Sequence, residues 1–142
     1  MTERLVGRTR DAGWEIGVSR TVPFPIDDVW DFLTSAAGSA VWLGAGVQRL
    51  DEPGAAYQTE AGTGGQIRSF RPRDRVRLTW RPVDWDHDST VQFTVTTAAG
   101  DRTRIGFHQE RLVDAAEREQ QRTHWQGVLD ALAAALAERA AS

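Results

Sequence analysis

Residues 114–139 read DAAEREQQRTHWQGVLDALAAALAER, and this stretch decides the fold. Asp114 and Glu117 stand three positions apart at its start, which is the spacing of a capping box, where each side chain accepts from a free backbone N–H. Strong helix formers dominate the stretch, and neither Gly nor Pro interrupts it before Gly127. The pattern predicts one long helix of about 25 residues, which would span roughly 38 Å at about 1.5 Å per residue.

The predicted helix has two unlike halves. Its second half carries apolar residues at helical spacing, namely Trp125, Val128, Leu129, Leu132, Ala133 and Leu136. The same stripe, continued towards the start of the helix, meets Arg118, Gln121 and Arg122. Either the first half extends into solvent, or it covers a cavity that holds water or a ligand. Periodicity does not distinguish these two interpretations, and both stay open at this point.

Composition excludes several classes of function. The chain of 142 residues is long enough for one domain with a sizeable core. Its net charge of −3 gives no reason to expect a nucleic acid as partner. The chain contains neither Cys nor Lys, so disulfides, thiolate metal sites and Schiff-base lysines are excluded. Without an apolar run of membrane-spanning length or a signal-peptide pattern, we expect a cytoplasmic protein and no membrane insertion.

The rest of the chain predicts an α+β fold. Alternation of apolar and polar residues predicts strands at 14–22, 47–50, 55–60, 66–71, 75–81, 91–95 and 105–109. After the first strand, Asp27 and Ser35 are expected to cap two short helices. Short connections favour sequential hairpins, hence a curved antiparallel sheet of about six to seven strands with the helices on one face. We expect residues 1–13 to be a flexible segment and 14–140 to form a single domain.

Several short motifs, taken in their order and spacing, resemble a known family. They are GVSRTV (17–22), VWDFLT (29–34), WLG (42–44), GQI (65–67), RVRLTW (75–80), HQERL (108–112), HW (124–125) and VLDAL (128–132). Together they are similar to the bacterial family named after the activator of the heat-shock protein 90 ATPase. That family belongs to the START, or SRPBCC, superfamily with its helix-grip fold. The resemblance covers residues 14–137.

The resemblance implies a fold and a range of functions. Members share an antiparallel sheet around a long C-terminal helix, usually with an internal hydrophobic cavity. Many bind small lipophilic ligands, some relatives are polyketide cyclases, and the eukaryotic namesake assists a chaperone, which implies a part in the stress response. Many members carry a His where Gln109 stands here, and by alternation His108 is expected to point to the opposite face of the strand. This departure weakens the expectation of chemistry by an inward His.

The leading hypothesis is that a small, largely apolar or amphipathic ligand binds in a cavity between the sheet and the long helix. The residues expected to line it are Trp42, Arg68, Trp80, Phe93, Phe107, Gln109, Gln121, Arg122 and Trp125. Arg122 is expected to receive an acidic or carbonyl end of the ligand, because an unpaired buried guanidinium costs several kcal/mol. The competing interpretation is that the aromatic residues only fill the core and that Arg68 faces solvent.

Three other features of the sequence, the acidic loop 84–88, Trp85 and His124, give weaker indications of function. The acidic loop 84–88 begins like a calcium loop but lacks its later Gly and Glu, so no metal site is predicted. Trp85 in that loop could cover the cavity or contact a partner. His124 has no carboxylate or nucleophile placed for it by spacing, so neither a catalytic residue nor a cofactor is predicted. Two alternatives stay open: a chaperone-associated or regulatory interaction module, with a homodimer also open, and a cyclase-like or hydrolase-like enzyme.

Overall fold

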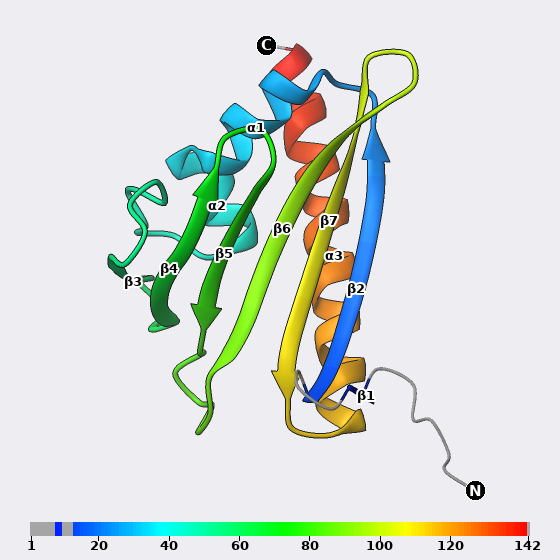
Figure 1. The fold of residues 1–142 in the computed structure, drawn as a ribbon. Coiled ribbons are helices and arrows are strands. Elements are labelled where there is room, and N and C mark those ends of the chain that lie inside the picture. Colours follow the sequence, from blue (N-terminus) through cyan, green and yellow to red (C-terminus); the bar gives the residue numbers. More distant parts are fainter. Residues whose placement is uncertain (1–7, 10–12, 142) are drawn as a thin grey trace, which may run out of the picture.

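Three helices and one curved antiparallel sheet form two layers in the computed structural model, which describes residues 8–9 and 13–141 (Figure 1). Within these residues the sheet has seven strands in the order β1-β2-β7-β6-β5-β4-β3. The strands are β1 Arg8–Thr9, β2 Gly13–Val22, β3 Ala56–Gln58, β4 Gly64–Arg71, β5 Arg75–Trp80, β6 Ser89–Ala98 and β7 Arg102–Leu112. The helices are α1 Ile26–Thr34, α2 Ala36–Trp42 and α3 Ala115–Ala141, and they lie on one face of the sheet (Figure 1). The predicted α+β helix-grip class is confirmed.

The long helix α3 begins with the predicted capping box. The backbone N–H of Glu117 donates to Asp114 Oδ1 at 2.8 Å, and the Glu117 carboxylate accepts from the N–H of Val113 at 3.1 Å. The apolar stripe of α3 is buried against the sheet through Trp125, Val128, Leu129, Leu132 and Leu136. No helix in the described part of the chain, α3 included, is long and apolar enough to cross a membrane.

Two short helices follow β2 and pack beside α3. Ser35 caps α2 as predicted, because its hydroxyl accepts from the N–H of Gly38 at 3.0 Å. The predicted cap of α1 is wrong, since Pro25 occupies the cap position and Asp27 lies in the first turn. The fixed φ of proline suits the start of a helix, and the carboxylate of Asp27 interacts favourably with the helix dipole from inside the first turn.

The edges of the sheet differ from the sequence prediction. The segment 47–50 forms no strand, although Val47 and Leu50 are buried. Val47 and Leu50 are three positions apart, so a strand would point them to opposite faces, whereas an irregular segment buries both without pairing. Conversely, Arg8–Thr9 pairs with Gly13–Trp14 inside the stretch that we expected to be flexible. Residues 1–7 and 10–12 of that stretch lie outside the described residues.

A bulge interrupts the pairing of β2 with β7. The two strands stay in register until Ile16 pairs with Gln109. Beyond that pair, β7 contributes two residues, Glu110 and Arg111, where β2 contributes only Glu15. Arg111 has a φ of 68°, in the left-handed region, as bulges often require. The bulge sets which side chains meet on the outer face of the sheet, the face away from the helices.

Candidate functional site

Aromatic rings fill the space between α3 and the sheet. Trp125 stacks on Phe107 with 4.8 Å between ring centroids and 16° between the ring planes. Trp80 contacts Trp125 at 5.8 Å, and Trp42 contacts Phe93 at 5.1 Å. All five residues are buried. The structure therefore brings the sequence-predicted aromatic residues together as one packed cluster, which we call the aromatic cluster.

A chain of hydrogen bonds runs through the aromatic cluster. Trp125 Nε1 donates to Gln109 Oε1 at 2.7 Å, and Gln109 Nε2 donates to Ser89 Oγ at 3.0 Å. The Ser89 hydroxyl donates to the carbonyl oxygen of Trp80 at 2.8 Å. Gln109 and Ser89 are completely buried, and their polar groups are tolerated there because each has a partner. The chain joins α3 to three neighbouring strands and fixes the orientation of the Trp125 ring.

Two polar atoms beside this series of hydrogen bonds have no hydrogen-bond partner among the residues that the structure describes. They are the indole Nε1 of Trp80 and Oε1 of Gln121, and both are buried. Trp80 is 6% exposed and Gln121 is 9% exposed. Both residues adjoin Trp125, Trp80 through its ring contact and Gln121 from one helical turn earlier on the same face of α3. A buried polar group left unpaired costs about 1–3 kcal/mol. The indole N–H of Trp80 therefore lacks an acceptor here, and the amide oxygen of Gln121 lacks a donor.

The loop between β5 and β6 covers Trp80. Trp85 packs edge-on against Trp80 with 5.2 Å between centroids, and it stacks on His87 at 4.5 Å. His87 Nε2 lies 2.7 Å from Glu117 Oε1 in the first turn of α3. Both side chains of this pair are largely buried. The loop is thus fastened to the start of α3 beside the aromatic cluster.

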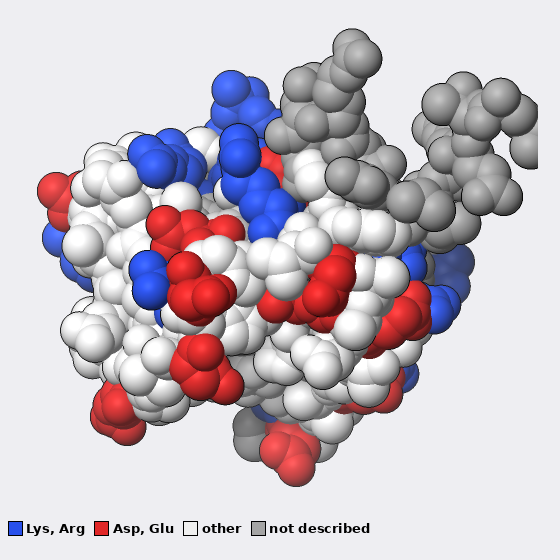
Figure 2. Space-filling view, turned by 90° about the horizontal axis from the view of Figure 1, so that it is seen from below, with Lys and Arg blue, Asp and Glu red and all other residues white. Residues whose placement is uncertain are grey.

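Both ring nitrogens of His87 face carboxylates. Besides Glu117 on Nε2, Asp86 lies 3.1 Å from Nδ1. Burial lowers the pKa of His87, but the hydrogen bonds to Asp86 and Glu117 outweigh it and hold the pKa above its usual 6.5. The end of the molecule that carries this loop, seen from below in Figure 2, presents both acidic and basic side chains. The two carboxylates that flank His87 favour an imidazolium and disfavour the approach of an anion.

Two basic candidates lie away from the aromatic cluster. The side chain of Arg122 is 52% exposed, lies 3.8 Å from Glu119, and borders a surface groove beside β2. It does not face the aromatic wall, which corrects our expectation, because the buried stripe passes through Gln121 instead. Arg68 is exposed while its neighbour Ile67 is buried, so Arg68 lies on the outer face of the sheet.

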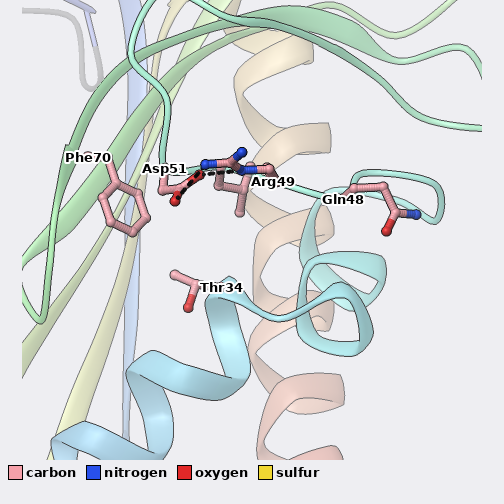
Figure 3. A pocket seen from close by; sticks show the side chains of 6 residues that line it. Thr34, Gln48, Arg49, Asp51 and Phe70 are labelled. Atoms are coloured by element: carbon pink, nitrogen blue, oxygen red, sulfur yellow. Dashed lines mark hydrogen bonds and ion pairs between the residues drawn. The ribbon is translucent and has the colours of Figure 1, made fainter.

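A separate small hollow lies at the end of α1, where Arg49 and Asp51 form an ion pair at 3.0 Å (Figure 3). It measures about 190 Å³ and is lined by Thr34, Gln48, Arg49, Leu50, Asp51 and Phe70. None of the sequence-predicted ligand residues borders it. The ion pair is largely exposed on both sides, so it contributes little to stability.

Ser89 and Glu117 belong to the region around the aromatic cluster and the β5–β6 loop, although the sequence did not indicate them as site residues. Ser89 stands two positions before Val91 and four before Phe93, so the alternation of β6 continued backwards would have placed it inward. Glu117 was predicted only as part of a helix cap. Its second partner, His87, comes from an irregular loop, where no periodicity predicts a contact.

Comparison with known proteins agrees with the fold. The family model described as activator of Hsp90 ATPase homolog 1-like protein matches residues 23–137. The search of curated proteins found no match. Among solved structures, DynU16, a protein in the dynemicin biosynthetic locus, is 24% identical with a TM-score of 0.77. That match covers 86% of this chain but only 46% of DynU16.

Two further structures have the same architecture. CalU16 from Micromonospora echinospora is 20% identical with a TM-score of 0.72, over 91% of this chain and 80% of that one. The solution structure of the Aha1 dimer from Colwellia psychrerythraea is 15% identical with a TM-score of 0.70, over 86% and 95%. At these identities the likeness shows the fold alone.

Proposed function

The chain belongs to the family of activator of Hsp90 ATPase homolog 1-like proteins, and on that premise we propose that it binds a small, largely apolar molecule. The binding site lies between the sheet and α3, beside Trp125 and beneath the β5–β6 loop. We propose further that residues 14–140 act as one domain in this role. The molecule is taken up without a cofactor.

One observation carries the proposal: Trp80 Nε1 and Gln121 Oε1 are both buried, belong to residues that adjoin Trp125, and have no hydrogen-bond partner among the described residues. A donor and an acceptor in this position suit a hydroxyl group, which accepts from the indole N–H and donates to the amide oxygen. Each such hydrogen bond is worth about 0.5–1.5 kcal/mol. The expected guest is therefore an aromatic or polycyclic body that carries a hydroxyl.

The walls of the site support an aromatic guest. Trp80, Phe107 and Trp125 present ring faces and edges, and such surfaces favour offset or edge-on stacking with a flat apolar molecule. Entry requires the β5–β6 loop to move, because Trp85 rests against Trp80. Connecting loops are the segments of a fold that open most easily. We therefore assign the lid to residues 82–88.

The chemistry of the polar end differs from our expectation from the sequence. Arg122 lies half-exposed outside the aromatic cluster, and the carboxylates of Asp86 and Glu117 flank His87 in the loop. Both features count against an anionic ligand. A neutral hydroxyl compound suits Trp80 and Gln121 better than a carboxylate does.

Ligand binding is tested first by native mass spectrometry of the purified protein, to find a molecule that co-purifies. Calorimetric titration with 2-naphthol and naphthalene then compares two bodies of one shape, with and without a hydroxyl. We expect 2-naphthol to bind about 5–150-fold more tightly, the worth of two hydrogen bonds. Gln121→Leu and Trp80→Phe should each remove one of these hydrogen bonds and so reduce this preference. Gln120→Leu, a change at an exposed neighbour on α3, should preserve it.

Three results would contradict ligand binding at this site. If no molecule co-purifies and neither compound binds, the aromatic cluster is only a core, and an interaction module in contact with a chaperone becomes the better assignment. Turnover of an ester or cyclase substrate that persists in Gln121→Leu would instead favour an enzyme with its chemistry elsewhere. Equal affinity for the two compounds in the wild type would exclude the role given to Trp80 and Gln121.

A further inference from the structure

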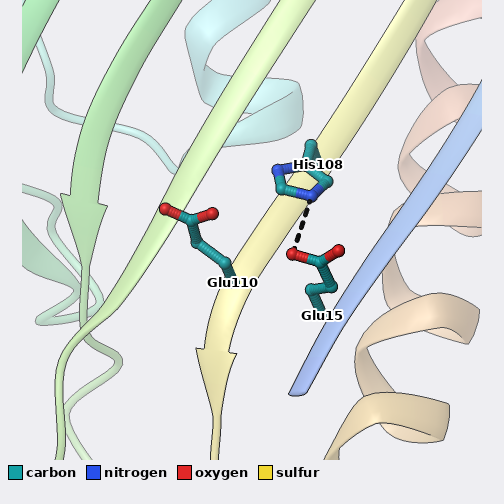
Figure 4. A group of neighbouring side chains, drawn as sticks. All are labelled: Glu15, His108 and Glu110. Atoms are coloured by element: carbon teal, nitrogen blue, oxygen red, sulfur yellow. Dashed lines mark ion pairs between the residues drawn. The ribbon is translucent and has the colours of Figure 1, made fainter. Parts of the chain in front are cut away.

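Three ligand-bearing side chains meet on the outer face of the sheet, away from the aromatic cluster. Glu15 comes from β2, and His108 and Glu110 come from β7 (Figure 4). One ligand atom from each lies within 4.8 Å of the other two. All three residues are partly buried. We propose that this group binds a divalent transition-metal ion, with Zn²⁺ as its representative.

The strand geometry explains why these three residues meet. His108 and Glu110 are two positions apart on β7, so they share a face, and Gln109 between them points into the core. The bulge then places Glu15 opposite Glu110 and Arg111. Bulges commonly re-aim a side chain in this way. The sheet therefore brings one imidazole and two carboxylates together from two neighbouring strands.

The distance between His108 and Glu15 suits a shared metal ion better than a direct ion pair. His108 Nε2 and Glu15 Oε2 are 3.5 Å apart, which is too long for a good hydrogen bond. Two ligand atoms on a tetrahedral Zn²⁺, at about 2.0–2.2 Å from the metal, lie roughly 3.4 Å apart. An imidazole nitrogen in the set favours Zn²⁺ and its neighbours over Mg²⁺ or Ca²⁺, which prefer oxygen ligands.

Space next to these side chains is open for the remaining coordination positions. A hollow of about 460 Å³ lies beside His108, and the residues that line it include the small residues Gly17, Ser19 and Gly106. A second hollow of about 580 Å³ adjoins Glu110. Three protein ligands with open positions is the arrangement of catalytic rather than structural zinc sites. Water or a small ligand would complete the coordination.

Arg77 competes with the metal for one of the carboxylates. Its guanidinium pairs with Glu110, and Figure 4 shows the Glu110 carboxylate leaning towards β6 while Glu15 and His108 face one another. Binding of an ion requires Glu110 to turn towards His108. Removal of the Arg77 charge should therefore strengthen metal binding. Non-specific binding of metal ions to other surface carboxylates would not show this effect.

The chain supplies its own matched control. His87 also has two carboxylates, Asp86 and Glu117, but they occupy opposite ring nitrogens and cannot converge on one ion. His87→Ala removes an imidazole of the same kind without touching the proposed site. This site is independent of the ligand site beside Trp125, so the two proposals fail separately.

The test is titration of tag-free, chelator-treated protein with Zn²⁺ by calorimetry, with Co²⁺ absorption as the spectroscopic readout. We expect one equivalent to bind, His108→Ala and Glu15→Gln to weaken affinity more than about tenfold, and Arg77→Gln to tighten it. His87→Ala should bind as the wild type does, and circular dichroism confirms that each variant is folded. An unchanged affinity in folded His108→Ala, the same loss in His87→Ala, or no binding by the wild type would overturn the proposal.

Discussion

The indole N–H of Trp125 on α3 donates to the side-chain oxygen of Gln109 on β7 at 2.7 Å, and both residues are completely buried. This bond ties the long helix to the strand next to the middle of the sheet. Both groups are shielded from water, so loss of the bond leaves a buried donor without its acceptor. Gln109 thus has a structural role at the position where many family members were expected to carry His.

Gln109→Leu should lower the free energy of unfolding by about 1–3 kcal/mol, because Trp125 Nε1 would stay buried without an acceptor. Chemical denaturation measures the loss. Gln92→Leu, on the outer face of β6, should change stability by no more than about 0.5 kcal/mol. A loss in Gln109→Leu as small as that would mean that the hydrogen bond has no net worth.

Trp125→Ala should cost about 3–5 kcal/mol, because it removes a fully buried ring that stacks on Phe107. Trp125→Phe should cost less, since most of the stacking area survives and only the N–H is lost. The difference between these two variants separates the packing contribution from the hydrogen bond. Similar losses in both would contradict this division.

The pair His87–Glu117 should make the closure of the β5–β6 loop depend on pH. The pKa of His87 is raised in the folded state, so protonation of His87 favours the folded state. The stabilisation is fully present below the usual pKa of 6.5 and is lost as pH rises through the raised value. Glu117→Gln should remove most of it, while Gln still serves in the capping box.

Two measurements check the pH prediction. In a proton NMR titration, the pKa of His87 should fall in Glu117→Gln and stay unchanged in Glu119→Gln, an exposed neighbour on α3. The stability difference between wild type and Glu117→Gln should shrink as pH rises. A difference that grows with pH would show that the pair has the opposite sign.

Two glycine substitutions should have opposite effects. A Cβ on Gly127 would meet nothing within 4 Å in the middle of α3, so Gly127→Ala should stabilise the protein by about 0.5–1 kcal/mol. A Cβ on Gly38 would lie 1.7 Å from the carbonyl oxygen of Phe32, so the backbone must shift. Gly38→Ala should cost at least about 1–3 kcal/mol. Thermal unfolding of both variants measures the contrast, and destabilisation by Gly127→Ala would contradict it.

Local sequence patterns predicted those structural elements that depend on residues close together in the sequence. The cap at Asp114, the stripe from Trp125 onward and the cap at Ser35 all depend on residues a few positions apart, and the structure has each of them. The alternation of apolar residues and the turn signals gave the order of elements, and the family motifs agreed with it. The segment 47–50 shows the limit, because the strand predicted there is an irregular segment in the structure.

Long-range geometry could not be predicted from single positions. Arg122 and Gln121 were both assigned to the inner stripe, but only Gln121 is buried, since a helix face as narrow as this admits one of two neighbours. The meeting of Glu15 with His108 depends on the register in which Ile16 pairs with Gln109, and alternation carries no information on register between strands.

The pairing of β2 with β7 also bears on how the chain acquires its fold during synthesis. Val22 pairs with Thr103, so the first long strand has its long partner only after both short helices and four other strands have been made. Until then β2 exposes an unpaired edge, and contacts between positions so distant in sequence form slowly. A ribosome-bound chain that lacks β7 and α3 should therefore be a target for chaperones, protected only when those two elements emerge.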